Sequence, residues 1–237
     1  ESAAQEPEII ALSEMLVAMG AQIEGAGSHV LKIRGMKKFS GCEMDVIPDR
    51  IEAGTFLMAV SATCGKVIIE NGMPRHIRAV TDKLVETGVS IQQGERCLEI
   101  ESHKQLGSVD VITLPFPGFP TDLQAQMMAA MTLSDGISVI TEKVYPERFI
   151  HISELNRMGA DIKLEGPTAI VKGKKRLSGA SVMASDLRAS AGLVIAGLIA
   201  EGQTEVYRVY HIDRGYEDIE KKLASLGADI KREKEES

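Results

Sequence analysis

Two acidic and three basic side chains lie near places where the sequence predicts that helices begin. They are Asp122, Asp186, Arg148, Arg188 and Arg214. A helix N-terminus presents free N–H groups and the positive end of the helix dipole, so it attracts anions. A guanidinium binds phosphate or carboxylate through paired hydrogen bonds. We therefore predict a pocket for a ligand that carries such groups, in which an ionised carboxylate could act as a base.

Each of these residues also has a simpler interpretation when it is taken alone. An Asp at a helix start often only caps the helix, which stabilises it by about 1 kcal/mol. Arg148 and Arg214 could form surface ion pairs that contribute little to stability. The five histidines and three cysteines show no spacing typical of metal ligands, so neither a metal site nor a cofactor is predicted.

The elements that would position these side chains come from an internal repeat. Four times, a glycine ends an amphipathic helical pattern and opens a predicted strand. These glycines, Gly20, Gly88, Gly159 and Gly227, are 68, 71 and 68 residues apart along the chain. Each is expected to be a left-handed residue that ends a helix. The segments 91–100 and 162–171 predict hairpins after two of them.

A second landmark lies between successive glycines. Asp49, Asp122 and Asp186 each precede a helix that is apolar nearly all round, which indicates burial on every side. Short strands are expected after these helices, at 67–69, 138–140 and 204–206. The amphipathic helices follow, as in the pattern Ile77, Val80, Leu84 and Val85.

The repeating unit is therefore strand, buried helix, strand, amphipathic helix and hairpin. Three such units suggest a pseudo-threefold α/β arrangement with the buried helices at its centre. Equivalent positions of the units would then lie at one end of the domain, where the five charged side chains would meet. The chain opens inside a fourth unit, so we expect a domain boundary between residues 1–47 and 48–237 and a natural polypeptide that extends N-terminally.

Composition narrows the class of protein. The 237 residues have a net charge of −7 and are 44% hydrophobic, which is typical of a globular protein and argues against nucleic-acid binding. The longest apolar run, 189–200, is too short to span a membrane. Cys42, Cys64 and Cys97 are odd in number; we expect mostly buried thiols, a reducing compartment and a cytoplasmic location.

Five segments resemble motifs of the UDP-N-acetylglucosamine enolpyruvyl transferases, or 1-carboxyvinyltransferases, and the resemblance extends over essentially the whole chain. These segments are PDRIEAGTF at 48–56, FPTDLQAQ at 119–126, ERF at 147–149, ASDLRAS at 184–190 and YHIDRGYE at 210–217. The resemblance implies an inside-out α/β barrel of two domains, each made of three βαβαββ units. Residues 1–47 then correspond to the tail of the first domain and residues 48–237 to most of the second.

The resemblance also implies a reaction and roles for individual residues. Enolpyruvyl would pass from phosphoenolpyruvate to the 3-hydroxyl of UDP-N-acetylglucosamine, the first committed step of peptidoglycan synthesis and hence of cell-wall biogenesis, cell shape and cell division. Asp122 would contact the sugar hydroxyl as the candidate base, and Val144 would contact the sugar nucleotide through its backbone. Arg148, Arg188 and Arg214 would hold the anionic groups of phosphoenolpyruvate, and Asp186 would lie near the reacting carbon.

The sequence departs from the family pattern in two motifs. The family's general acid is a cysteine in a Gly-Gly-Cys-like context of the first domain, and a Lys–Asn pair near the family's N-terminus is also needed. Neither motif occurs here; Gly41-Cys42 is superficially similar but lies in the wrong unit. We therefore expect the chain to need the N-terminal half of the enzyme as its partner and to show little turnover alone.

Three other interpretations remain open from the sequence. The first is the shikimate-pathway enolpyruvyl transferase, which shares the fold and the chemistry. The second is a non-catalytic binding half of a split enzyme, and the third is a structural repeat protein such as a clamp, which predicts no convergent arginine cluster.

Overall fold

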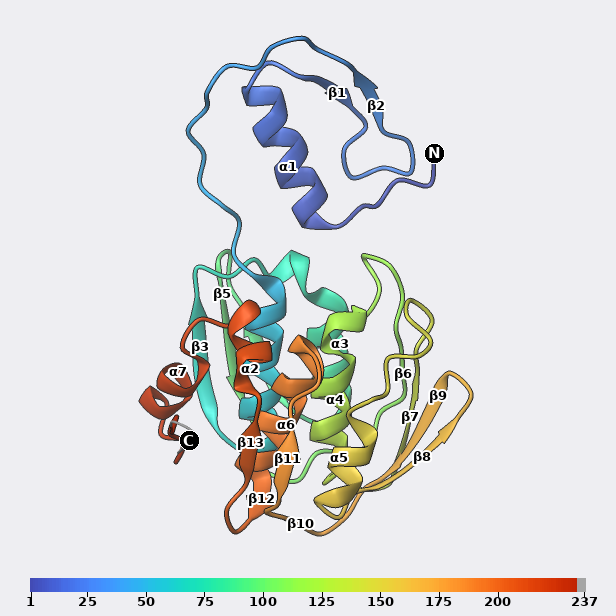
Figure 1. Cartoon of the computed structure of the whole chain (residues 1–237), viewed down its shortest axis with the longest axis vertical. Coiled ribbons are helices and arrows are strands. Elements are labelled where there is room, and N and C mark those ends of the chain that lie inside the picture. The colour runs from blue at the N-terminus through green and yellow to red at the C-terminus, as the bar shows by residue number, and fades with distance from the viewer. Residues whose placement is uncertain (234–237) are drawn as a thin grey trace.

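The computed structural model describes residues 1–233, which form a small N-terminal segment and a larger main lobe of mixed α/β structure (Figure 1). In the N-terminal segment, helix α1 (Pro7–Ala18) is followed by an antiparallel pair, β1 (Gln22–Glu24) and β2 (Lys32–Arg34). Residues 35–49 form no helix or strand and lead into the main lobe, residues 50–233. Arg50 Nε donates to Glu8 Oε1 at 2.8 Å and so joins the two parts.

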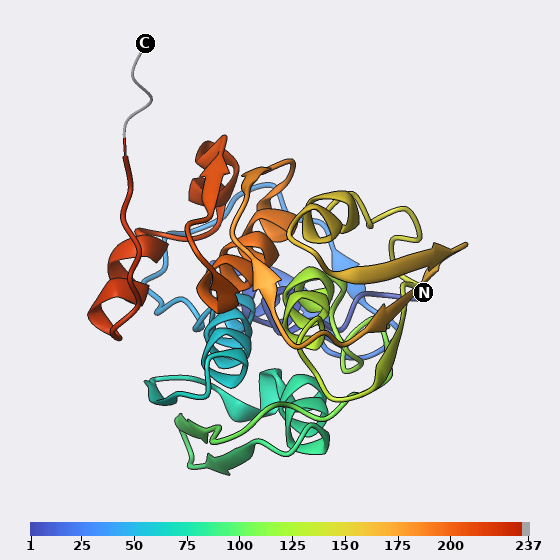
Figure 2. The same cartoon turned by 90° about the horizontal axis from the view of Figure 1, so that it is seen from below.

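Three buried helices form the centre of the main lobe: α2 (Arg50–Ala62), α4 (Gln124–Met131) and α6 (Leu187–Ile199). Each contacts the other two, and Figure 2 shows them side by side with the strands outside them. Every residue of α4 is buried. This is the consequence of helices that are apolar all round, since no face of them is suited to water.

Two glycines allow these helices to approach closely. A Cβ atom on Gly54 of α2 would lie 2.3 Å from the Leu123 side chain. A Cβ atom on Gly192 of α6 would lie 2.8 Å from the carbonyl oxygen of Ala125 in α4. The approach of α6 to α4 therefore depends on the absence of a side chain at Gly192, whereas Gly54 leaves room for the side chain of Leu123 just before α4.

The sheets and outer helices surround this centre. The first sheet has the antiparallel order β3-β5-β4, and the second has the order β6-β7-β9-β8, in which only β6 and β7 are parallel. Two short parallel pairs, β10-β12 and β11-β13, complete the third unit. The strands are β3 (Lys66–Glu70), β4 (Ser90–Gln93), β5 (Cys97–Glu101), β6 (Val111–Ile112), β7 (Ile137–Thr141), β8 (Asp161–Glu165), β9 (Thr168–Lys172), β10 (Leu177–Ser178), β11 (Ser181–Met183), β12 (Ala200–Glu201) and β13 (Glu205–Tyr207). The outer helices are α3 (Arg78–Glu86), α5 (Ile152–Arg157) and α7 (Ile219–Ser225), and 3₁₀ turns lie at η1 (Pro74–His76), η2 (Thr121–Leu123) and η3 (Val209–Arg214).

The predicted repeat is confirmed at its landmarks. The four helix-ending glycines, Gly20, Gly88, Gly159 and Gly227, all have positive φ angles, from 93° to 103°. The three short strands expected after the buried helices are β3, β7 and β13. The predicted hairpins are β4-β5 and β8-β9. The third unit differs, because residues 228–233 after Gly227 form no strand.

Two sequence-based expectations about burial are wrong. The apolar spacing that includes Val85 predicts burial for it, but Val85 is 51% exposed because α3 packs through Val80 and Leu84. The cysteines Cys42, Cys64 and Cys97 are all exposed rather than buried. They lie in the connecting segment, in the turn after α2 and at the start of β5, where neighbouring elements do not cover them. In the described part of the chain no helix is long and apolar enough to cross a membrane.

The close contact at Gly192 gives a first prediction. Gly192→Ala should lower the free energy of unfolding by about 1–2 kcal/mol, because overpacking against the α4 backbone outweighs the better helix propensity of alanine. Denaturant unfolding of the chain measures the change. The control is Gly35→Ala, whose Cβ would meet nothing within 4 Å and which should change stability by less than about 0.5 kcal/mol. Equal stability of Gly192→Ala and the parent would contradict the role of this contact.

Candidate functional site

A carboxylate between two guanidiniums lies at the end of the main lobe where the central helices begin. Arg148 Nη1 donates to Asp122 Oδ1 at 2.6 Å, and Arg188 Nη2 donates to Asp122 Oδ2 at 3.4 Å. The Arg188 side chain is only 12% exposed and that of Asp122 is 38% exposed. Arg188 Nη1 is buried and has no hydrogen-bond partner among the described residues. We call Asp122, Arg148 and Arg188 the charged cluster.

The three repeated aspartates do not play the same role. Asp49 accepts hydrogen bonds from the N–H groups of Ile51 and Glu52 and so caps α2. Asp186 caps α6 in the same way, through the N–H groups of Arg188 and Ala189. Asp122 instead lies within η2, and its side chain makes no cap hydrogen bond there. Its carboxylate therefore faces the arginines, and the simple capping interpretation holds for Asp49 and Asp186 only.

A buried acid that sequence analysis did not single out supports the cluster. Glu142 is fully buried and accepts hydrogen bonds from the hydroxyls of Thr113 (2.5 Å) and Thr121 (2.9 Å). Thr121 Oγ1 in turn accepts from Arg148 Nη1 at 3.1 Å. Glu142 thereby fixes the hydroxyl that orients Arg148. Its only sequence signal was a charged residue directly after a half-buried strand.

The same glutamate binds the backbone of Val144. The N–H groups of Val144 and Tyr145 both donate to Glu142 Oε1 at 2.9 Å. The Val144 side chain is 43% exposed. A ligand contact through the Val144 backbone would therefore involve its carbonyl oxygen, because the N–H is already satisfied.

Arg214 is the predicted site residue that the structure joins least closely to the others. It is exposed, and no hydrogen bond or ion pair links it to the charged cluster. Its neighbour Gly215 nevertheless packs closely against Leu187, since a Cβ on Gly215 would lie 2.8 Å from that side chain. Arg214 is therefore held near the start of α6, at the same end of the lobe as Asp186 and Arg188.

A buried histidine lies beneath this end of the lobe. His151 is 1% exposed, and neither of its ring nitrogens has a hydrogen-bond partner among the described residues. Burial lowers the pKa of His151 to about 4; the Asp186 carboxylate opposes this shift, and Arg148 adds to it. The imidazole is therefore neutral at pH 7 and adds no charge to the site.

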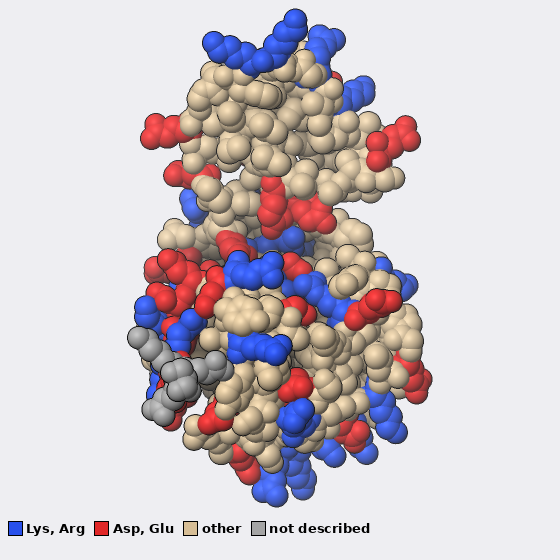
Figure 3. Space-filling view, viewed as in Figure 1, with Lys and Arg blue, Asp and Glu red and all other residues tan. Residues whose placement is uncertain are grey.

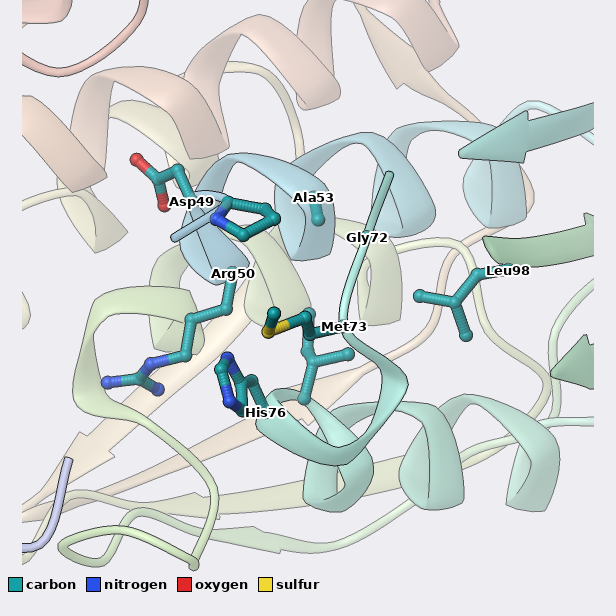
Figure 4. Close-up of a pocket in the computed structure, with 9 residues that line it drawn as sticks. Asp49, Arg50, Ala53, Gly72, Met73, His76 and Leu98 are labelled. Carbon is teal, nitrogen blue, oxygen red and sulfur yellow. The ribbon is translucent and has the colours of Figure 1, made fainter. Parts of the chain in front are cut away.

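Another hollow lies at the start of α2, close to the N-terminal segment (Figure 4). Its lining includes Asp49, Arg50, His76 and the apolar Met73 and Leu98. Arg50 and His76 lie side by side there, and burial together with Arg75 lowers the pKa of His76. The guanidinium of Arg50 is already engaged with Glu8. The charged cluster does not line this hollow.

Basic and acidic side chains gather on the end of the main lobe that faces the N-terminal segment (Figure 3). In the charged cluster itself, two guanidiniums outnumber one carboxylate. The unpartnered N–H of Arg188 suits an anionic group. The geometry thus agrees with a site that binds phosphate or carboxylate.

Comparison with known proteins identifies the family. The sequence model of the EPSP synthase (3-phosphoshikimate 1-carboxyvinyltransferase) family matches residues 1–223. The chain belongs to the EPSP synthase family. Among solved structures, the enolpyruvyl transferase NikO from Streptomyces tendae is similar with a TM-score of 0.87 and 27% identity, over 97% of this chain and 55% of that one. The EPSP synthase of Acinetobacter baumannii shares the fold, with a TM-score of 0.59 and 20% identity over 80% of this chain and 44% of that one.

Within the family, curated relatives with much higher identity are sugar-nucleotide enzymes by name. The UDP-N-acetylglucosamine 1-carboxyvinyltransferase 1 of Caldanaerobacter subterraneus is 54% identical over 98% of this chain and 56% of its own length. The UDP-N-acetylglucosamine 1-carboxyvinyltransferase of Geobacter metallireducens is 53% identical over 99% of this chain and 56% of its own length. The chain thus spans about half the length of these relatives.

The buried histidine predicts a pH dependence of stability. The pKa of His151 is about 4 in the folded chain, against an ordinary value of 6.5 for histidine. The unfolded chain therefore binds a proton first as the pH falls below about 6.5, and stability drops down to about pH 4. Between pH 7.5 and 5, this residue should remove roughly 2 kcal/mol from the free energy of unfolding.

Denaturant unfolding of the parent and of His151→Gln at both pH values measures this contribution. His151→Gln should lose less stability on acidification, whereas the exposed-site control His103→Gln should behave like the parent. The same loss in His151→Gln and in the parent would show that His151 does not titrate as described.

Proposed function

We propose that this chain is part of an enzyme that transfers enolpyruvyl from phosphoenolpyruvate to the 3-hydroxyl of UDP-N-acetylglucosamine, the first committed step of peptidoglycan synthesis. The observation that carries the proposal is the Asp122 carboxylate between Arg148 and Arg188, at the end of the lobe where the central helices begin. Relatives more than 50% identical to the chain carry the name of this activity.

The cluster supplies the groups that such a reaction needs. Asp122 is the candidate base for the sugar hydroxyl, because it is a carboxylate at a partly open position. Arg148, Arg188 and Arg214 would hold the phosphate and carboxylate of phosphoenolpyruvate, and the Val144 carbonyl would contact the sugar nucleotide. Asp186 would lie near the reacting carbon, where a negative charge stabilises an oxocarbenium-like centre.

The chain covers 56% of the length of each of the two curated relatives, which supports a proposal about which part of the enzyme it forms. We propose that residues 48–237 form most of one three-unit domain of an inside-out α/β barrel, and that residues 1–47 belong to the preceding domain; residues 234–237 lie outside the described part. The general-acid cysteine and the Lys–Asn pair would come from a further, N-terminal portion of the enzyme. The reaction would take place in the cytoplasm and needs neither a metal nor a cofactor.

The decisive experiment measures phosphate release from phosphoenolpyruvate and UDP-N-acetylglucosamine. We expect little release with the chain alone. We expect substantial release when it is combined with the N-terminal portion that the matched relatives have. Absence of release from the combined protein would overturn the proposal.

The other interpretations predict different results in the same assay. Release with 3-phosphoshikimate but not with the sugar nucleotide would indicate the shikimate-pathway reaction. Binding of UDP-N-acetylglucosamine without release would indicate a non-catalytic binding half. A structural clamp predicts no convergent arginine cluster, so the contacts of Asp122 with both Arg148 and Arg188 disfavour that interpretation.

Substitution of the candidate base gives a sharper prediction. In the complete enzyme, Asp122→Asn should lower kcat by about 10²–10⁴, because an amide cannot accept the sugar proton. Steady-state phosphate release measures kcat, and thermal unfolding checks that the variant is folded. The control Asp82→Asn removes an exposed carboxylate on α3 and should leave kcat within about twofold. A folded Asp122→Asn enzyme with parental kcat would remove Asp122 from the mechanism.

A further inference from the structure

Tyr216 connects several elements directly beneath the charged cluster. Its side chain is 1% exposed, although it carries a hydroxyl. The hydroxyl lies 2.8 Å from Thr55 Oγ1 of α2 and 3.2 Å from Gln126 Nε2 of α4. The guanidinium carbon of Arg188, in α6, lies 5.4 Å from the centre of the Tyr216 ring. One side chain thus contacts all three central helices.

The direction of these hydrogen bonds follows from counting protons. Thr55 has one hydroxyl proton and donates it to the carbonyl oxygen of Ile51 at 2.9 Å. Thr55 Oγ1 therefore accepts from the Tyr216 hydroxyl. Gln126 Nε2 lies 3.2 Å from both the Tyr216 oxygen and Thr55 Oγ1, and these two oxygens share its second proton. Gln126 also donates to the carbonyl oxygen of Asp122 at 2.9 Å, which fixes its amide orientation because two acceptors would repel each other.

Two members of the charged cluster depend on this arrangement. The Tyr216 ring face supports the Arg188 guanidinium through a cation–π contact, which is stronger where water is excluded. The Tyr216 hydroxyl holds Gln126, and Gln126 holds the backbone at Asp122. Loss of the Tyr216 hydroxyl would therefore loosen the Asp122 carboxylate. Loss of the ring would loosen the Arg188 guanidinium.

We propose that Tyr216 is a positioning residue for the reaction described above: its ring orients Arg188 toward the anion, and its hydroxyl, through Gln126, orients Asp122 toward the sugar hydroxyl. This inference rests on the proposed function. Tyr216 does not itself touch the reacting atoms. It acts through the two residues that do.

Two substitutions in the complete enzyme separate the two routes. Tyr216→Phe keeps the ring and removes the hydroxyl, so kcat should fall about tenfold while the KM for phosphoenolpyruvate stays within about twofold. Tyr216→Leu removes the ring as well, so the KM for phosphoenolpyruvate should also rise about tenfold. Steady-state phosphate release with each substrate varied in turn measures these constants.

The matched control is Ser61→Ala, which removes a fully buried hydroxyl at the other end of α2 that donates to Leu57. It should lower the thermal unfolding temperature without changing kcat or either KM. Parental constants in both folded Tyr216 variants would overturn the proposal. The proposal would also be overturned if the two variants changed kcat and the KM for phosphoenolpyruvate in the same way.

Two further measurements cover the cases in which Tyr216→Leu does not fold or the parent enzyme shows no turnover. If Tyr216→Leu does not fold, Thr55→Val removes the acceptor of the Tyr216 hydroxyl and should reproduce the lowered kcat; parental kcat would overturn the proposal. If the parent enzyme shows no turnover, the proposed function fails. Titration of the chain with inorganic phosphate then tests the positioning role. Tyr216→Leu and Arg188→Ala should each weaken phosphate binding about tenfold, and unchanged binding in Tyr216→Leu would overturn the proposal.

Discussion

Close packing of the three apolar helices α2, α4 and α6 is the constraint on which the rest of this structure depends. Their burial on every side removes apolar surface from water, and this is the main force available to a chain with few aromatic residues. Gly54 and Gly192 let the helices approach closely. Asp122, just before α4, and Arg188, in the first turn of α6, are brought together at one end of the lobe.

The three repeated aspartates differ in what their carboxylates bind. Asp49 and Asp186 satisfy the free N–H groups of their own helices, as helix-starting aspartates usually do. Asp122 lies in a 3₁₀ turn before α4, and its carboxylate does not cap that helix. Its carboxylate is thus free to bridge arginines from two different elements, and this departure from the repeat marks the site.

Buried polar groups around the cluster determine how firmly its members are held. Glu142 binds two threonine hydroxyls and two backbone N–H groups, and through Thr121 it orients Arg148. Tyr216 contacts the Arg188 guanidinium through its ring face and Gln126 through its hydroxyl, and Gln126 donates to the carbonyl oxygen of Asp122. Each hydrogen bond in this buried network restricts the geometry of the next, and Arg188 Nη1 and Gln126 Oε1 are the buried side-chain atoms of Arg188 and Gln126 that have no partner among the described residues.

The repeat, the helix-ending glycines, the central helices and the family of the chain could all be predicted from the order of its residues. These features rest on local signals, such as helical periodicity and the conformational freedom of glycine at Gly88 or Gly159, which operate within a few residues. Which of the charged residues are in contact depends on the folded arrangement of the helices. Asp122 contacts arginines 26 and 66 positions away, whereas Arg214 stays exposed and the supporting roles of Glu142 and Tyr216 were not foreseen. Such pairings depend on how whole helices pack, and no local pattern encodes the side-chain directions that result.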